Sequence, residues 1–130
     1  MKKILFLVFL SLTSLFIVPF MANAQSKSAN PVLRHVVLFK FKDDATPADV
    51  KKVEDAFVAL KGKIKLIKGF EWGLNNSPEK LNQGLTHAFV ATFASEKDRD
   101  AYLVHPDHVA FTKIAGPIID KVTVVDFWVK

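Results

Sequence analysis

Two segments of the chain alternate their side chains with the period of a β-strand, and they constrain the fold more than any other feature. Successive side chains of a strand point to opposite sides of the sheet. In the segment 85–94, one face carries Leu85, His87, Phe89, Ala91 and Phe93. In the segment 32–42, the corresponding face carries His35, Val37, Phe39 and Phe41. Both patterns predict strands that bury one face under other elements.

A helix is predicted between these strands. Thr46 is a typical N-cap, Pro47 suits the first helical position, and Asp49 lies where the positive end of the helix dipole favours a carboxylate. The apolar residues that follow recur at helical spacing, and Gly62 ends the pattern. The segment 64–67 fits either a helical turn or extended chain.

The second helical region is predicted to be split in two. Ser95 caps a helix that runs to about Val104, and His105-Pro106 then breaks the chain direction, because the residue before a proline avoids helical geometry. Pro106 opens a further helical segment to about Ile114, which Gly116-Pro117 ends.

Two more strands complete the plan, at 69–75 and 121–129. The order β-α-β-β-α-β predicts an α+β domain of the ferredoxin-like type. Its helices cover one face of the sheet and leave the other bare. Because Val36, Leu38 and Val90 fall on that second face, we expect a homodimer that packs sheet against sheet.

The first residues have the pattern of a secretory signal peptide. Lys2 and Lys3 precede a long apolar run, and Ala22-Asn23-Ala24 is a small-x-small cleavage site. We expect a signal peptide over 1–24, a linker over 25–31 and the domain over 32–130, with a secreted or periplasmic product. An uncleaved membrane anchor is the alternative, although Pro19 near the end of the run favours cleavage.

Composition narrows the function classes. Removal of residues 1–24 would lower the formal net charge from +5 to +3, because only Lys2 and Lys3 are charged there. The remaining lysines are mixed with acidic residues, so we expect no nucleic-acid partner. After cleavage no membrane contact is expected. The chain has no cysteine, so disulfides cannot stabilise the exported domain.

Three motifs together resemble the stress-responsive A/B barrel (Dabb) family. They are the strand that begins at His35, Thr86-His87 at the start of the third long strand, and Tyr102-Leu-Val-His105-Pro-Asp-His108. The family's fold is a ferredoxin-like dimer whose two sheets form an α/β barrel. The family includes plant polyketide cyclases, although a shared fold does not transmit an activity.

The resemblance assigns roles to four residues. It implies that Tyr102 and His108 are catalytic, in an aldol-type cyclase or lyase reaction, and that His35 and His87 bind the substrate. His108 would act as a general base, since the first turn of a helix lowers the pKa of an imidazole. Tyr102 would polarise a carbonyl or stabilise an enolate. The alternative is that the two strand histidines are ordinary buried residues with hydrogen-bond partners, and that Tyr102 is a core residue.

The remaining histidine is interpreted as structural. His105 precedes Pro106, and we expect it to hydrogen-bond at the helix end. His105-x-x-His108 has the spacing of two metal ligands, but no strong third ligand is evident, so we expect neither a metal nor a cofactor.

Three functions remain open from the sequence. The first is binding of a small apolar ligand, in a stress response. The second is catalysis by His108 and Tyr102. The third is a structural dimer without a ligand, which would have no cavity joining Tyr102, His108 and the strand histidines.

Overall fold

The computed structural model describes residues 31–130, so the predicted signal peptide and linker residues 25–30 lie outside the described residues. Seven elements follow in the order β1 (Leu33–Phe41), α1 (Pro47–Lys63), β2 (Gly69–Leu74), β3 (His87–Phe93), α2 (Glu96–Leu103), α3 (Pro106–Ala115) and β4 (Ile119–Trp128). The split second helix is confirmed. The ambiguous segment 64–67 forms a short turn, because Ile64 caps α1 and Ile67 N donates to Ile64 O at 3.1 Å.

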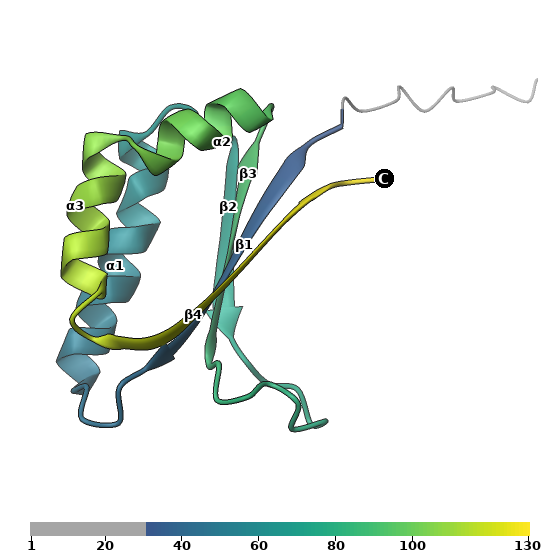
Figure 1. The fold of residues 1–130 in the computed structure, drawn as a ribbon. Helices are drawn as coiled ribbons and strands as arrows, with labels where there is room; N and C mark the ends of the chain where they lie inside the picture. The colour runs from purple at the N-terminus through teal and green to yellow at the C-terminus, as the bar shows by residue number, and fades with distance from the viewer. Residues whose placement is uncertain (1–30) are drawn as a thin grey trace, which may run out of the picture.

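The four strands form one antiparallel sheet in the order β2-β3-β1-β4. The helices lie together on one side of this sheet, and α1 and α3 run side by side (Figure 1). This is the ferredoxin-like α+β fold that the sequence predicts.

The first helix begins as its sequence indicates. Thr46 Oγ1 accepts from the backbone N–H of Asp49 at 3.2 Å, and Asp49 Oδ2 accepts from Thr46 N at 3.1 Å, which forms a reciprocal capping box. These hydrogen bonds from Thr46 lower the pKa of the Asp49 carboxyl. The box fixes where α1 starts and therefore which of its residues face the sheet.

An aromatic cluster forms the core between the sheet and the helices. Phe57 of α1 lies at its centre, with ring centroids 4.6 Å from Phe89 and 4.4 Å from Phe111. Phe39 of β1 packs against the same group. The buried residues 33, 35, 37 and 39 of β1 confirm the predicted alternation. This cluster holds α1 and α3 against the sheet and forms one end of the space beneath them.

The edge strand β4 is open to solvent on both of its faces. Val122 and Val124, on the helix side, are 51% and 50% exposed. Val125 and Phe127, on the bare side, are 52% and 48% exposed. The helices therefore cover β1 and β3 but leave β4 partly uncovered. No helix within residues 31–130 is long and apolar enough to cross a membrane.

Candidate functional site

A cavity of about 470 Å³ lies under the helices, between β1 and β4 on one side and α2 and α3 on the other. Most of its lining is apolar, including Val37, Phe39, Phe111 and Val124. Thr112 and Asp120 also line it, but four other polar side chains lie close to one another on its wall: His35, Tyr102, His108 and Asp126. A few polar groups in an otherwise apolar concavity are typical of a small-molecule site.

Tyr102 is the most unusual of these groups. It lies at the end of α2 and is 0% exposed, yet its hydroxyl has no hydrogen-bond partner among the described residues. Buried polar atoms nearly always have a partner, so this hydroxyl calls for an explanation. Burial raises the pKa of Tyr102 far above its usual value, so the hydroxyl keeps its proton and can donate it to a ligand.

His108 lies beside Tyr102, with ring centroids 4.3 Å apart. Its Nδ1 donates to the backbone oxygen of Leu103 at 3.0 Å, which leaves Nε2 unprotonated in the neutral ring. Burial lowers the pKa of His108, the hydrogen bond to Leu103 opposes this, and nearby His35 and His105 lower it further. The sequence analysis also predicts a lowered pKa for His108, but it attributes the effect to the first turn of the helix, whereas in the structure burial is the largest cause.

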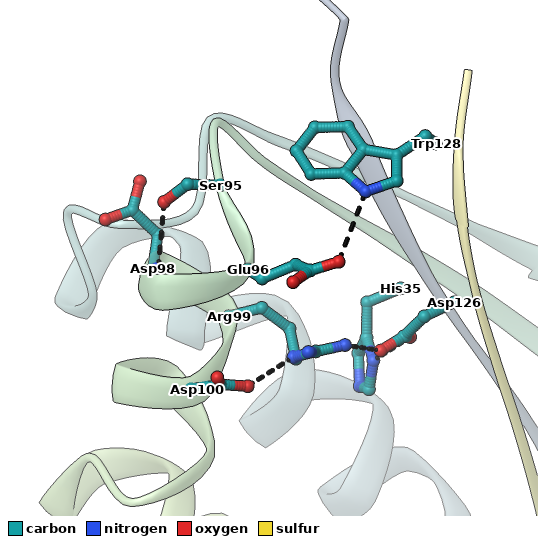
Figure 2. Close-up of polar contacts among 8 residues, drawn as sticks. All are labelled: His35, Ser95, Glu96, Asp98, Arg99, Asp100, Asp126 and Trp128. Carbon is teal, nitrogen blue, oxygen red and sulfur yellow. Dashed lines mark hydrogen bonds and ion pairs between the residues drawn. The ribbon is translucent and has the colours of Figure 1, made fainter. Parts of the chain in front are cut away.

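His35 reaches the same cavity from β1. Its ring centroid lies 5.8 Å from that of Tyr102, and its Nδ1 donates to Asp126 Oδ1 at 2.6 Å. Asp126 lies on the neighbouring strand β4, opposite His35 in the register. The other oxygen of Asp126 accepts from Arg99 of α2 (Figure 2).

The structure places His87 apart from the other three predicted site residues, His35, Tyr102 and His108. Its Nε2 donates to Glu54 Oε1 at 3.0 Å, and its Nδ1 lies 2.8 Å from Thr86 Oγ1, so both ring nitrogens have partners. It lines a second cavity of about 440 Å³, between the loop that follows β2 and the bare sheet face at Leu38. The predicted cluster of four residues is therefore a cluster of three.

His105 has the structural role that the sequence indicates. It is the N-cap of α3, and its Nδ1 accepts from the backbone N–H of Asp107 at 3.2 Å. Within residues 31–130, no group of three or more potential ligands lies where it could hold a metal ion.

Sequence reasoning missed two residues of this site, Asp126 and Arg99. Asp126 is an acidic residue within the otherwise apolar strand segment Val124-Val125-Asp126-Phe127-Trp128. A carboxylate in such a segment is a sequence signal that could have identified Asp126 as a candidate site residue. Its partner could be found only from the register of β1 and β4, because 91 positions separate His35 from Asp126.

The fold and the cavity define a class of small ferredoxin-like domain with a polar cluster in an apolar pocket. The family model described as the Stress Responsive A/B Barrel Domain (Dabb) matches residues 33–129, and the chain belongs to this family.

Known proteins extend the comparison. The stress-response A/B barrel domain-containing protein HS1 of Arabidopsis thaliana is 37% identical over 101 residues, which is 78% of this chain and 93% of that protein. Olivetolic acid cyclase of Cannabis sativa is 28% identical over 95 residues, 73% of this chain and 94% of the cyclase. A dimeric ferredoxin-like protein of unknown function from Bacteroides fragilis superposes with a TM-score of 0.61 at 32% identity, over 74% of this chain and 94% of its own.

Proposed function

We propose that this domain binds a small, largely apolar molecule in the cavity beside Tyr102. The observation that carries the proposal is the Tyr102 hydroxyl, which is buried and protonated on the wall of an apolar space and has no hydrogen-bond partner within residues 31–130. A carbonyl or hydroxyl oxygen of a ligand would accept its hydrogen bond. The cavity volume of about 470 Å³ falls in the range of small-molecule sites.

A matched pair of probes tests this function. Acetophenone carries a carbonyl acceptor, whereas ethylbenzene has a similar shape without one. We expect the wild-type protein to bind acetophenone more tightly in an NMR titration, and Tyr102→Phe to remove that preference. Thr86→Val, which deletes a hydroxyl outside this cavity, should keep it. Equal binding of the two probes to the wild type would overturn the role of Tyr102.

Catalysis is a second candidate, and it is favoured by the unprotonated Nε2 of His108, which has no hydrogen-bond partner among residues 31–130. The lowered pKa keeps this imidazole neutral near pH 7, which a general base requires. In the proposed step, a C–H bond next to a carbonyl breaks and its proton goes to His108 Nε2. The electron pair moves to the carbonyl oxygen, and the resulting enolate accepts a hydrogen bond from Tyr102. The enolate carbon then takes the proton back from His108, or it attacks a second carbonyl whose oxygen receives the π electrons and takes that proton from His108, as in an aldol reaction.

Similarity to olivetolic acid cyclase supports this candidate at the level of family membership. Proton abstraction can be tested without knowing the substrate, by following exchange of the acetophenone methyl protons in D₂O by NMR. We expect the wild type to accelerate the exchange and His108→Ala not to. Normal binding of acetophenone without any acceleration would leave a binding protein and remove the catalytic role.

We also propose that the domain forms a homodimer through its bare sheet face. Val36, Leu38 and Val90 are half-buried there, and Val125 and Phe127 are exposed beside them. Burying such a surface is favourable in proportion to its apolar area. Several solved structures similar to this chain are dimeric, including the one from Bacteroides fragilis.

Export is proposed from residues 1–24 alone. Expression of the full chain with a tag at its C-terminus, followed by N-terminal sequencing of the product, tests it. We expect the sequence to begin at Gln25; a product that keeps Met1 or the apolar run would contradict cleavage.

A further inference from the structure

Asp126 is held from two sides. Its Oδ1 accepts from His35 Nδ1 at 2.6 Å, and its Oδ2 accepts from the Arg99 guanidinium (Figure 2). Arg99 is fixed in turn, because its Nε donates to Asp100 Oδ1 at 2.7 Å. The side chains of Arg99 and Asp126 are only 20% and 24% exposed, so this chain of contacts is partly shielded from water.

A second contact joins the same two elements. Glu96 and Arg99 are one turn apart on α2, whereas Asp126 and Trp128 are two residues apart on β4 and therefore share a face. Trp128 Nε1 donates to Glu96 Oε1 at 3.3 Å, beside the contact between Arg99 and Asp126 (Figure 2). Two side-chain contacts thus join α2 to the strand that lies beside His35.

The hydrogen-bond chemistry determines where the proton of His35 sits. A guanidinium only donates and a carboxylate only accepts, so the nitrogen of His35 that faces Asp126 must carry a hydrogen. A neutral His35 is therefore protonated on Nδ1, and its Nε2 is an acceptor. Because Nδ1 is occupied by Asp126, Nε2 is the ring nitrogen left for a molecule in the cavity.

We propose that Arg99 is a positioning residue of this site, which orients Asp126 and thereby presents His35 Nε2 to the ligand as a hydrogen-bond acceptor. This inference rests on the proposed binding function. The cavity would then offer a donor, Tyr102 Oη, and, in addition to His108 Nε2, a second acceptor, His35 Nε2. A hydroxyl group can accept from the first and donate to the second. The expected ligands are therefore apolar molecules that carry an alcohol or phenol.

The tautomer of His35 can be measured directly by ¹⁵N NMR of the imidazole nitrogens in the full-length protein and its variants. We expect a proton on Nδ1 in the wild type. In Asp126→Asn, Arg99 still only donates, so the amide oxygen must face Arg99 and the amide N–H must face His35. The ring then has to carry its proton on Nε2, since an amide in place of the carboxylate enforces the other tautomer.

A double variant tests whether Arg99 sets the orientation of the side chain at position 126 or only contacts it. In Arg99→Met with Asp126→Asn, the amide is free to turn its oxygen toward His35, and the Nδ1–H form should return. Three results would overturn the proposal: Nε2–H in the wild type, retention of Nδ1–H in the single variant Asp126→Asn, or Nε2–H in the double variant. The wild-type measurement alone keeps the proposal falsifiable if the variants do not fold.

Binding is measured with 4-ethylphenol and its methyl ether, 4-ethylanisole, which differ in the hydroxyl donor. We expect the wild type to prefer the phenol about tenfold, a typical effect of one buried hydrogen bond. Asp126→Asn should lose most of this preference. If neither probe nor acetophenone binds, the proposed function fails, whatever the tautomer. If acetophenone binds but the wild type does not distinguish the phenol from its ether, the acceptor role of His35 fails while the function stands.

Discussion

The ring of Tyr102 lies 4.3 Å, centroid to centroid, from the ring of His108, across the bend that joins α2 to α3. The bend produces this contact. His105 N donates to Tyr102 O at 3.0 Å, and His108 Nδ1 donates to Leu103 O, so α3 folds back over the end of α2. A continuous helix would place positions 102 and 108 on different faces, because six residues correspond to about 600° of rotation. The proline break is therefore what brings the two rings together.

Removing the Tyr102 hydroxyl should weaken ligand binding without destabilising the fold. Tyr102→Phe deletes a buried polar atom that has no partner in the described part of the chain, so we expect the free energy of unfolding to stay the same or to rise by about 1 kcal/mol. Affinity for acetophenone should fall. Chemical denaturation and NMR titration measure the two effects. Tyr102→Ala is the comparison, since loss of the buried ring should cost about 3–5 kcal/mol. A large loss of stability in Tyr102→Phe would mean that the hydroxyl has a structural partner.

His108 should make the fold less stable in mild acid. Burial holds its pKa in the folded protein below the ordinary value of 6.5, so the unfolded chain binds more protons in the interval between the two values. The contribution of this group to the free energy of unfolding is therefore undiminished above pH 6.5. It decreases as the pH falls through that interval and changes no further below the folded pKa.

The difference between wild type and His108→Gln isolates this effect from other titrating groups. Denaturation midpoints of both proteins between pH 7.5 and about 5 give the measurement. We expect the wild type to lose stability faster than the variant below pH 6.5. Parallel curves would show that His108 titrates in the folded state as it does in the unfolded chain.

The two strand histidines should behave differently when each is changed. His87→Ala leaves Glu54 without its partner but changes no wall of the cavity beside Tyr102, so stability should fall by about 1–3 kcal/mol while acetophenone binding persists. His35→Ala changes the cavity itself and should weaken binding of 4-ethylphenol. Titration of both variants with both probes decides between these sites. Loss of acetophenone binding in His87→Ala would restore His87 to the ligand site, as the family resemblance implies.

Most of the fold can be predicted from the sequence, because the fold depends on local periodicities and on capping residues. Thr46 and Pro47 specify the start of α1, and His105-Pro106 specifies the bend, from their own chemistry. Alternation along β1 identifies its buried face.

The site depends instead on long-range register. The partner of His35 is Asp126, and the partner of His87 is Glu54, 33 positions away on another element. Side chains that share an apolar face in two strands look equivalent in sequence. Only the packing of the helices on the sheet separates them, because it brings Glu54 of α1 to His87 and brings Tyr102 and His108 of α2 and α3 to the cavity that His35 lines.

A charge on the bare sheet face should separate the proposed dimer into monomers. Val125 is 52% exposed on this face in the single chain, and Val125→Glu would bury a carboxylate between two sheets if the dimer formed there. Burying an unpaired charge costs several kcal/mol, which exceeds what one valine contributes to an interface. Val58→Glu is the matched control, because Val58 is 38% exposed on α1, away from the sheet. We expect light scattering to give a dimer mass for the wild type and for Val58→Glu, and a monomer mass for Val125→Glu. A monomeric wild type, or a Val125→Glu protein that stays dimeric, would show that this face is not the interface between two copies.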